Sequence, residues 1–306
     1  MPTFKKILVV VDSSQAEHPE LQRAMQLAQH GEVRLHLLDV MKDVSFTVRL
    51  LSRDYAHIHE LLTKEKRKLL QKLVDQCRAH SIKADGEVLE GVSSQVTLKV
   101  AQQIEADLII RATKGKGSRQ PGRLGTSSQK LIQRPPCPIW LADPTRETTC
   151  RTIVATVDAS PGDEDHQQLN RRIMQIAIAL ADRERAKLLV SYVWSLYGSE
   201  MLRHRLPASE FETLINFNRQ QHRESFDALL SEFDLHVGGP AARMLEGEPS
   251  LAIPELCEKA DADLLICGTV ARQGIPGLLL GNTAERIVQR VPCSILAVTP
   301  PAAASL

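Results

Sequence analysis

The chain has 306 residues, more than one hydrophobic core usually holds, and this length predicts two domains of ordinary size. Its 38 Lys and Arg residues nearly balance its 37 Asp and Glu residues, so the whole molecule lacks the strong field that draws nucleic acid or an anionic membrane. No apolar run reaches membrane-spanning length, and the first one ends at Asp12, too soon for a signal segment. We therefore expect a cytoplasmic protein without a membrane partner.

Short Val, Ile and Leu runs alternate with helical patterns along the chain and predict strands separated by helices. Helical spacing of apolar residues predicts a helix that stops before Gly31 and a longer amphipathic helix that contains Leu62, Leu69 and Cys77. Five strands are predicted in the first half, several apolar throughout as in a parallel sheet covered on both faces, at residues 7–11, 35–40, 84–89, 108–110 and 139–141.

The second half repeats this pattern. KKILVVVDSS at 5–14 matches RTIVATVDAS at 151–160, and EADLIIRATKG at 105–115 matches DADLLICGTVA at 261–271. Strand, helix, strand with short loops predicts βαβ units with right-handed crossovers. We predict two tandem α/β domains, at 1–145 and 151–302, each a doubly wound, Rossmann-like fold with a five-stranded parallel sheet flanked by helices.

The six cysteines show no C-x-x-C spacing, which in a chain of this length favours buried thiols over a disulfide framework. They are Cys77, Cys137, Cys150, Cys257, Cys267 and Cys293.

A ligand site is predicted where the strands end. Open parallel sheets bind ligands beyond the carboxyl ends of their strands, at the point where the strand order reverses. Asp12 and Asp158 follow the first strand of each half, and a glycine-containing loop follows the fourth strand. If strands one and four are neighbours, each aspartate and its loop face one crevice, and the helix that starts near Thr126 or Asn282 adds its N-terminal dipole for a phosphate.

These repeated motifs resemble the universal stress protein family in tandem form, similar to the two-domain E-type members of bacteria. The resemblance covers about 3–144 and 151–300. It rests on V-D-x-S after strand one, on a D-L-[IL]-[IL] strand at Asp107–Ile110 and Asp263–Ile266, and on a variant of the family pattern G-x2-G-x9-G-[ST]. It implies a stress-response role. It also implies that the two halves pack through their fifth strands as a pseudo-dimer within one chain, and that two chains can form a homodimer.

The resemblance also implies a site for ATP with Mg²⁺. In nucleotide-binding relatives the aspartate after strand one meets the adenine, a valine at the end of strand two flanks the base or ribose, and the glycine loop with its Ser or Thr holds the phosphates. By position, the contacts in the first half are Asp12, Val40, Ala112, Gly115, Gly125 and Thr126. Those in the second half are Asp158, Val193, Gly268, Gly281 and Asn282.

The first half is the better nucleotide candidate. In the second, Ala271 puts a Cβ where the loop should approach a phosphate, and Asn282 lacks the hydroxyl of a Ser or Thr; in the first, Ala112 only ends a strand. Residues 111–134 contain no acidic residue, and their seven basic residues favour a small anion. These are Arg111, Lys114, Lys116, Arg119, Arg123, Lys130 and Arg134.

Other ligand classes receive less support. The basic segment has no aromatic residue, which argues against specific nucleic-acid binding. Its GSRQPGRL stretch is not a phosphate-binding P-loop, because Arg123 and Leu124 replace the required Lys and Ser or Thr. His57 and His59, on different helix faces, and the DEDH cluster at 163–166 do not predict a dedicated metal site.

Aromatic residues gather in the second half. The simplest explanation for these aromatic residues is that they pack in the core and in the interface between the halves. The alternative is an apolar cleft, formed with Leu278–Leu280, that binds a hydrophobic ligand or a protein partner. They are Tyr192, Trp194 and Tyr197 after strand two and Phe211, Phe217, Phe226 and Phe233 along a helical region.

Three functions stay open from the sequence. The first is a non-catalytic, ATP-binding stress regulator. The second is an interaction scaffold or apolar-ligand binder with both phosphate loops degenerate. The third is a slow nucleotide hydrolase, although no nucleophile, base and oxyanion arrangement has a sequence signature here.

Overall fold

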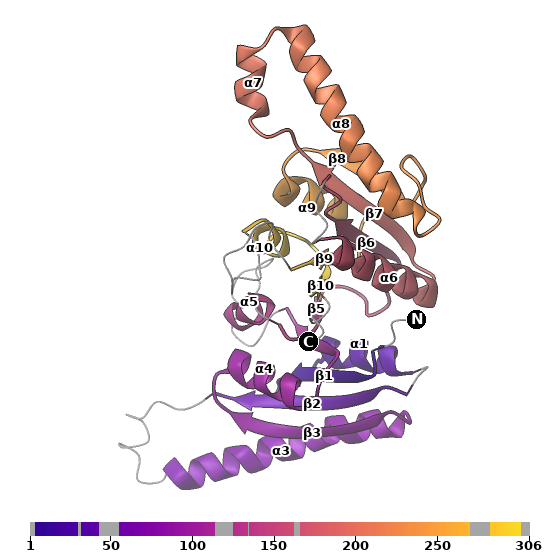
Figure 1. Cartoon of the computed structure of the whole chain (residues 1–306). Coiled ribbons are helices and arrows are strands. Elements are labelled where there is room, and N and C mark those ends of the chain that lie inside the picture. Colours follow the sequence, from indigo (N-terminus) through magenta and orange to yellow (C-terminus); the bar gives the residue numbers. More distant parts are fainter. Residues whose placement is uncertain are drawn as a thin grey trace, which may run out of the picture. The chain divides into compact units, whose positions relative to one another are not determined.

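The computed structural model describes residues 4–29, 32–42, 55–113, 125–133, 135–161, 166–269 and 282–300, without the side chains of 55, 56 and 282. The chain forms two compact units (Figure 1). The first unit comprises Thr3–Thr148 with Ser294–Ala297, and the second comprises mainly Thr149–Cys293 with the segment from Val298. The predicted domains, 1–145 and 151–302, divide the chain near the same place, but the unit division assigns 294–297 to the first unit.

The first unit is built on a parallel sheet with the strand order β3-β2-β1-β4-β5, to which β10 adds an antiparallel strand beside β5. The strands are β1 (Lys6–Val11), β2 (Arg34–Met41), β3 (Lys83–Glu90), β4 (Leu108–Ala112), β5 (Ile139–Ala142) and β10 (Ser294–Val298). The helices are α1 (Pro19–Ala28), α3 (Tyr55–Ala79), α4 (Ser93–Gln103) and α5 (Thr126–Gln133). The predicted neighbourhood of strands one and four is confirmed, because Val9 of β1 pairs with Ile110 of β4.

Helices cover both faces of this sheet, as the apolar strands predict. Residues 7–11 of β1 are all buried. Figure 1 shows α3 and α4 on opposite sides of the β2–β3 edge. Gly86 of β3 lets α3 lie close, since a Cβ there would meet the Leu37 carbonyl oxygen at 2.8 Å and Val74 Cγ2 at 3.2 Å. The doubly wound prediction is confirmed.

The second unit repeats the parallel order as β9-β6-β7-β8. Its strands are β6 (Thr152–Val157), β7 (Lys187–Trp194), β8 (Ala242–Glu246) and β9 (Leu264–Gly268). Its helices are α6 (Gln167–Glu184), α7 (Ser199–Arg205), α8 (Ala208–Ser231), α9 (Pro249–Lys259) and α10 (Asn282–Val288). Tyr192 and Trp194 lie within β7, not after the second strand as we had predicted from the sequence.

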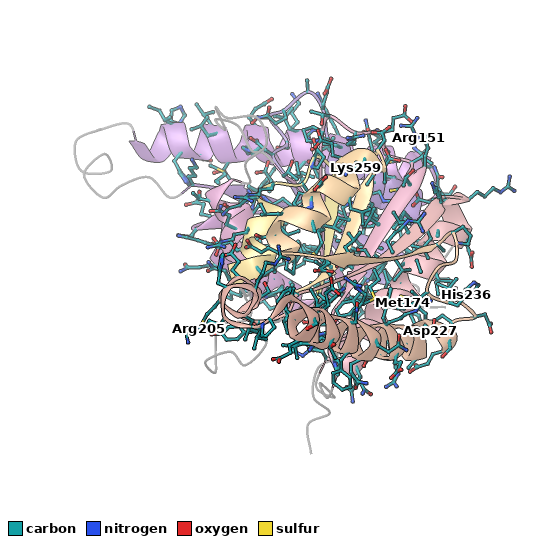
Figure 2. All side chains as sticks on the ribbon, turned by 90° about the horizontal axis from the view of Figure 1, so that it is seen from above. Arg151, Met174, Arg205, Asp227, His236 and Lys259 are labelled. Carbon is teal, nitrogen blue, oxygen red and sulfur yellow. The ribbon has the colours of Figure 1, made fainter. Side chains whose placement is uncertain are left out.

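Helices α7 and α8 form a hairpin between β7 and β8. Figure 2 shows α8 running between Arg205, which ends α7, and His236, which follows α8. Asp227 near the end of α8 accepts a hydrogen bond of 2.8 Å from the backbone N–H of Val237, which fixes the exit of the chain from the helix. On α6, Met174 is fully buried.

All six cysteines are buried and free of disulfides, as predicted. Among the described residues, none of the helices combines the length and the apolarity that crossing a bilayer requires.

Candidate functional site

The predicted contacts of the first half meet at the carboxyl ends of β1 and β4. Val10 pairs with Arg111, so Asp12 and Thr113 follow the ends of neighbouring strands. The backbone N–H of Gly125 donates to the Thr113 carbonyl oxygen at 3.3 Å, which brings the start of α5 to the same edge. Ala112 ends β4 half-buried, and Val40 lies half-buried near the end of β2. Gly115 lies outside the described residues.

Asp12 belongs to an ion cluster that the sequence did not reveal. Lys66 of α3 places its Nζ 2.8 Å from Asp12 Oδ1 and 2.9 Å from each carboxylate oxygen of Asp39 in β2. Asp39 also accepts from the backbone N–H of Ser13 at 2.8 Å and from the Ser13 hydroxyl. One ammonium therefore joins α3 to the ends of β1 and β2.

Charge is strongly stabilised in this cluster. Burial opposes the ionisation of Asp12, but hydrogen bonds from Lys66, Ser14 and Gln15 outweigh it and hold the pKa of Asp12 well below its usual range. Burial likewise opposes the charge of Lys66, yet its bonds to Asp12 and Asp39 raise the pKa of Lys66 above 10.5. Asp12 keeps 35% of its side chain exposed, whereas Asp39 keeps 1%. The crevice therefore presents an ionised carboxylate.

Thr113 supplies an unused hydroxyl at the same edge. The residue is 6% exposed, and its Oγ1 has no hydrogen-bond partner among the described residues. Burying a hydroxyl without a partner costs about 1–3 kcal/mol, so such a group in a native site calls for an explanation. The Thr113 backbone contacts Gly125, directly before the α5 N-terminus, where backbone N–H groups and the helix dipole favour an anion.

The equivalent edge of the second unit holds a chain of hydrogen bonds between side chains. Asp158 Oδ1 accepts from the Ser160 hydroxyl at 2.7 Å, and this hydroxyl lies 3.2 Å from the Tyr192 hydroxyl. The Tyr192 hydroxyl lies 2.6 Å from Nδ1 of His222 in α8. Asn170 pairs with the backbone N–H and carbonyl of Asp158, at 3.0 and 2.7 Å. The second copy thus keeps the aspartate but surrounds it with different chemistry.

The other predicted contacts of the second half have internal roles where the structure describes them. A Cβ on Gly268 would meet Leu169 Cδ2 of α6 at 2.8 Å, so close helix packing accounts for this glycine. Thr269 follows β9 as Thr113 follows β4. Its hydroxyl donates a hydrogen bond of 3.3 Å to the Val298 carbonyl oxygen. Val193 is buried. Gly281 lies outside the described residues, and Asn282 begins α10.

The predicted basic segment is only partly described. Arg111 lies in β4 and donates from Nη1 to the Ser93 hydroxyl at 3.1 Å, and burial lowers the pKa of its guanidinium. Lys130 is exposed on α5, as is Thr126 at the start of that helix. The remaining basic positions, Lys114, Lys116, Arg119, Arg123 and Arg134, lie outside the described residues.

The described residues contain no group of three or more His, Cys, Asp or Glu side chains placed to hold a metal. His59 Nε2 lies 2.7 Å from Glu90 Oε1, whereas His57 is exposed. Residues 163–165 of the acidic cluster lie outside the described ranges.

Most of the described aromatics of the second half belong to its core. Tyr192, Trp194, Phe211 and Phe226 are between 0% and 7% exposed. Tyr197 and Phe217 are 98% and 64% exposed, together with Met201 of α7 at 53%. The Leu278–Leu280 segment of the predicted apolar cleft lies outside the described residues.

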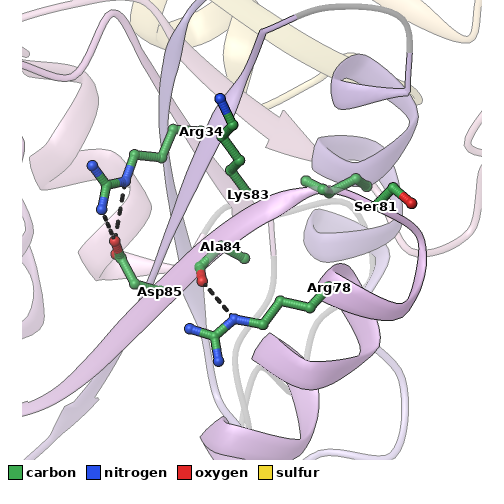
Figure 3. Close-up of a pocket in the computed structure, with 7 residues that line it drawn as sticks. Arg34, Arg78, Ser81, Lys83, Ala84 and Asp85 are labelled. Carbon is green, nitrogen blue, oxygen red and sulfur yellow. Dashed lines mark hydrogen bonds and ion pairs between the residues drawn. The ribbon is translucent and has the colours of Figure 1, made fainter.

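A hollow of about 540 Å³ lies at the amino ends of β2 and β3 (Figure 3). Arg34 donates from Nε and Nη2 to Asp85 Oδ2 at 3.1 and 2.7 Å, and Arg78 Nε donates to the Ala84 carbonyl at 3.0 Å. The Asp85 carboxylate thus partly neutralises the positive charge in this hollow. The hollow also lies at the end of the sheet opposite to Asp12 and Thr113. We therefore place the candidate site at the carboxyl ends.

Comparison with known proteins agrees with this architecture. The model of the universal stress protein family matches residues 3–143 and 150–299. The chain belongs to the universal stress protein family. Its two matched segments make it a tandem member of this stress-response family.

Relatives named universal stress protein E match this universal stress protein over nearly their full length. A universal stress protein E homolog from Haemophilus influenzae is 25% identical over 97% of this chain and 98% of its own length. Universal stress protein E from Escherichia coli K12 is 22% identical over 98% and 95%.

Solved structures show the same fold. A protein of unknown function from Pseudomonas aeruginosa PAO1 gives a TM-score of 0.75 at 24% identity, covering 97% of this chain and 93% of that one. A universal stress protein from Archaeoglobus fulgidus gives 0.66 at 14% identity, covering 97% and 98%. At these identities the likeness concerns the fold.

Proposed function

We propose that this protein is a non-catalytic stress-response regulator whose first domain binds a phosphorylated small ligand, ATP with Mg²⁺. The observation that carries the proposal is the Thr113 hydroxyl, buried without a partner among the described residues, in a residue whose backbone carbonyl accepts from Gly125 directly before α5. A phosphate oxygen is an acceptor that this hydroxyl and the backbone N–H groups of a helix N-terminus suit. Asp12 and Val40 would then meet the base and ribose.

The difference between the two copies supports the first domain as the nucleotide site. Thr269, the counterpart of Thr113, has the Val298 carbonyl as its acceptor. In the second domain the position of Asp39 is taken by Tyr192, whose hydroxyl already contacts Ser160 and His222. We therefore assign the Asp158, Val193, Gly268, Gly281 and Asn282 set a lesser role in nucleotide binding.

A Thr113→Val variant tests the assignment, with Thr269→Val as its matched control. Titration calorimetry with ATP and Mg²⁺ should show binding to the wild type, about tenfold weaker binding to Thr113→Val, and wild-type affinity in Thr269→Val. Because Thr113→Val removes an unpaired hydroxyl while keeping the shape, its stability should equal or exceed that of the wild type. An unchanged ATP affinity in Thr113→Val would remove this threonine from the site.

Exposed apolar side chains favour a second candidate, an interaction scaffold that self-associates through the α7–α8 region. Tyr197, Met201 and Phe217 are more than half exposed. Exposed apolar patches are typical of interaction sites, and these three side chains lie in or next to two helices that contact each other. Sedimentation velocity should then show association that depends on concentration and that Phe217→Ser weakens; a monomer at all concentrations would exclude it.

A further inference from the structure

Arg111 of β4 faces the same side of the sheet as two of the predicted ligand contacts. It pairs with Val10 of β1, which pairs in turn with Leu38 of β2, so these three side chains share one face. Val40 and Thr113 lie two residues further along β2 and β4, and Thr113 is still hydrogen-bonded to β5, so both share that face as well. Arg111 therefore lies next to the site, one step inside the carboxyl ends of the strands.

The guanidinium of Arg111 is held at the start of α4. Its Nη1 donates to the hydroxyl of Ser93, the first residue of that helix, at 3.1 Å. A guanidinium has five N–H donors, and within the described residues this is the one that is accepted. Glu20 acts on Arg111 through its electric field and is itself hydrogen-bonded to His18. A half-buried cation without a close counter-ion costs free energy, which an external anion can offset.

The start of α4 adds backbone donors beside this guanidinium. The first N–H groups of a helix have no acceptor within the helix, and Val92, which precedes α4, makes no side-chain hydrogen bond to them. The Val92 side chain is 52% exposed. On the same face of the sheet, the buried Thr113 hydroxyl is without a partner among the described residues. Donors of three kinds, from Arg111, from α4 and from Thr113, are thus left for a ligand.

The second domain holds an anion of its own at the equivalent helix start. LEGVSS in the first half matches LEGEPS in the second, so Glu248 takes the place of Val92. The Glu248 carboxylate accepts from the Ser250 hydroxyl at 2.5 Å and from Arg286 Nη1 at 3.3 Å. The Ser250 hydrogen bond and the nearby arginines lower the pKa of Glu248. A carboxylate of the chain itself therefore occupies the start of α9.

The cation, in contrast, is absent from its equivalent position in the second domain. Cys267 of β9 takes the place of Arg111 in the repeat and is 4% exposed. Burial, with a contribution from Cys293, raises the pKa of Cys267 to about 12, so this thiol is neutral at pH 7. The first domain thus has a cation where the second has a neutral group, and an apolar residue where the second has an anion.

We propose that Arg111 and the N-terminus of α4 form an anion subsite in the first domain, separate from the N-terminus of α5, and that this subsite binds a phosphate group of the ligand. The inference rests on the proposed nucleotide site and adds a residue that directly precedes the G-x2-G-x9-G-[ST] positions. Guanidinium and helix N-terminal N–H groups both donate to phosphate oxygens and both bring positive charge. ATP and free pyrophosphate share this chemistry.

Calorimetric Kd values for pyrophosphate and for ATP with Mg²⁺ test the subsite in the wild type, Arg111→Gln and Arg34→Gln. Gln at position 111 keeps an N–H donor for Ser93 but removes the charge, so binding of both ligands should weaken about tenfold or more. Arg34→Gln removes the same charge from the amino end of β2, where the side chain is 68% exposed, and should leave both Kd values within about twofold of the wild type.

The two ligands separate the subsite from the nucleotide assignment. An unchanged Kd in Arg111→Gln, for either ligand that the wild type binds, would overturn the subsite. Binding of pyrophosphate that depends on Arg111, in a protein that does not bind ATP, would overturn the nucleotide assignment and leave the subsite in place. A wild type that binds neither ligand would overturn both.

Urea unfolding without ligand separates a binding role of Arg111 from a structural one. Arg111→Gln removes a half-buried charge that lacks a close carboxylate in the described part of the chain, so its stability should equal or exceed that of the wild type. A clear loss of stability in the absence of ligand would assign Arg111 to the fold and overturn the proposal.

Val92→Glu transfers the carboxylate of Glu248 to the start of α4. It should occupy the subsite from within and weaken pyrophosphate and ATP binding about tenfold. Gln102→Glu is the matched control, because it adds the same charge at an exposed position near the other end of α4 and should leave both Kd values unchanged. Equal Kd values in Val92→Glu and Gln102→Glu would overturn the placement of the subsite at the α4 N-terminus.

Discussion

Asp39 and Tyr192 occupy the same register position in the two halves of the chain. Asp39 of β2 lies opposite Val11, the last residue of β1, and Tyr192 of β7 lies opposite Val157, the last residue of β6. The repeated fold thus places an acidic residue and a phenol at equivalent strand ends.

Each of these residues is linked to the long helix of its own unit, by different chemistry. Asp39 is paired with Lys66 of α3, whereas the Tyr192 hydroxyl meets His222 of α8. The Tyr192 and Trp194 rings also lie near His222, with centroids 5.8 and 5.3 Å from it. The helix is therefore anchored by charge in the first unit and mainly by aromatic packing and a hydrogen bond in the second.

Loss of Lys66 alone should destabilise the first unit. Lys66→Met leaves the buried Asp39 carboxylate unpaired, which should cost about 3–5 kcal/mol. Combining Lys66→Met with Asp39→Leu replaces the pair by apolar side chains and should restore much of that loss. Urea unfolding at pH 7 measures both, with the exposed Lys68→Met as a control expected within about 0.5 kcal/mol of the wild type. A double variant as unstable as Lys66→Met would contradict the pairing.

The ion cluster should also set a pH window for stability. The lowered pKa of Asp12 means that its contribution is complete above its unfolded value of 3.8 and is lost as the pH falls below that toward its folded pKa. The raised pKa of Lys66 means that its contribution is complete below 10.5 and is lost as the pH rises through its folded pKa. The stability difference between the wild type and Asp12→Asn should therefore be flat from about pH 5 to 10 and shrink on either side. A difference that changed between pH 6 and 8 would point to another titrating group.

The first strand was predictable because it is a short apolar run. Residues 7–11 were predicted and Lys6–Val11 was found, since a strand buried on both faces carries successive apolar side chains. Helix α7 was not predicted. Its sequence, SEMLRHR, has no buried residue, so no apolar periodicity marks it.

The site was predictable only as far as it depends on strand ends. Asp12 was predicted as a site residue because it directly follows the apolar run of β1. The buried Asp39 is an acidic residue inside the strand β2, and we did not predict its role. Lys66 stood among other charged residues of α3, and nothing in that pattern distinguishes it, because its role depends on residues 27 and 54 positions away. The different states of the Thr113 and Thr269 hydroxyls depend on neighbouring backbone and have no sequence signal.

Gly268→Ala should destabilise the second unit, because its Cβ would lie 2.8 Å from Leu169 Cδ2. Overpacking of this kind costs about 1–3 kcal/mol. In a Leu169→Ala background the added methyl group has room, so the same substitution should cost under about 0.5 kcal/mol there. Gly125→Ala is the matched control, since its Cβ would meet the Thr113 carbonyl at an ordinary 3.8 Å. Equal costs of Gly268→Ala in both backgrounds, measured by urea unfolding, would rule out the Leu169 contact as the cause.

The buried cysteines should resist thiol reagents until the protein unfolds. Burial raises the pKa of Cys77 from 9.0 to about 11 and, with a contribution from Cys293, that of Cys267 to about 12. Because the thiolate is the reactive form, a rise of two units lowers its fraction at pH 8 about a hundredfold, and lack of access slows the reaction further. Iodoacetamide at pH 8 should therefore label all six cysteines in urea and label Cys77 and Cys267 slowly in the native protein. Since Cys267 directly precedes Gly268 in β9, rapid native labelling of Cys267 would contradict this packing and show that the edge near Asp158 opens locally.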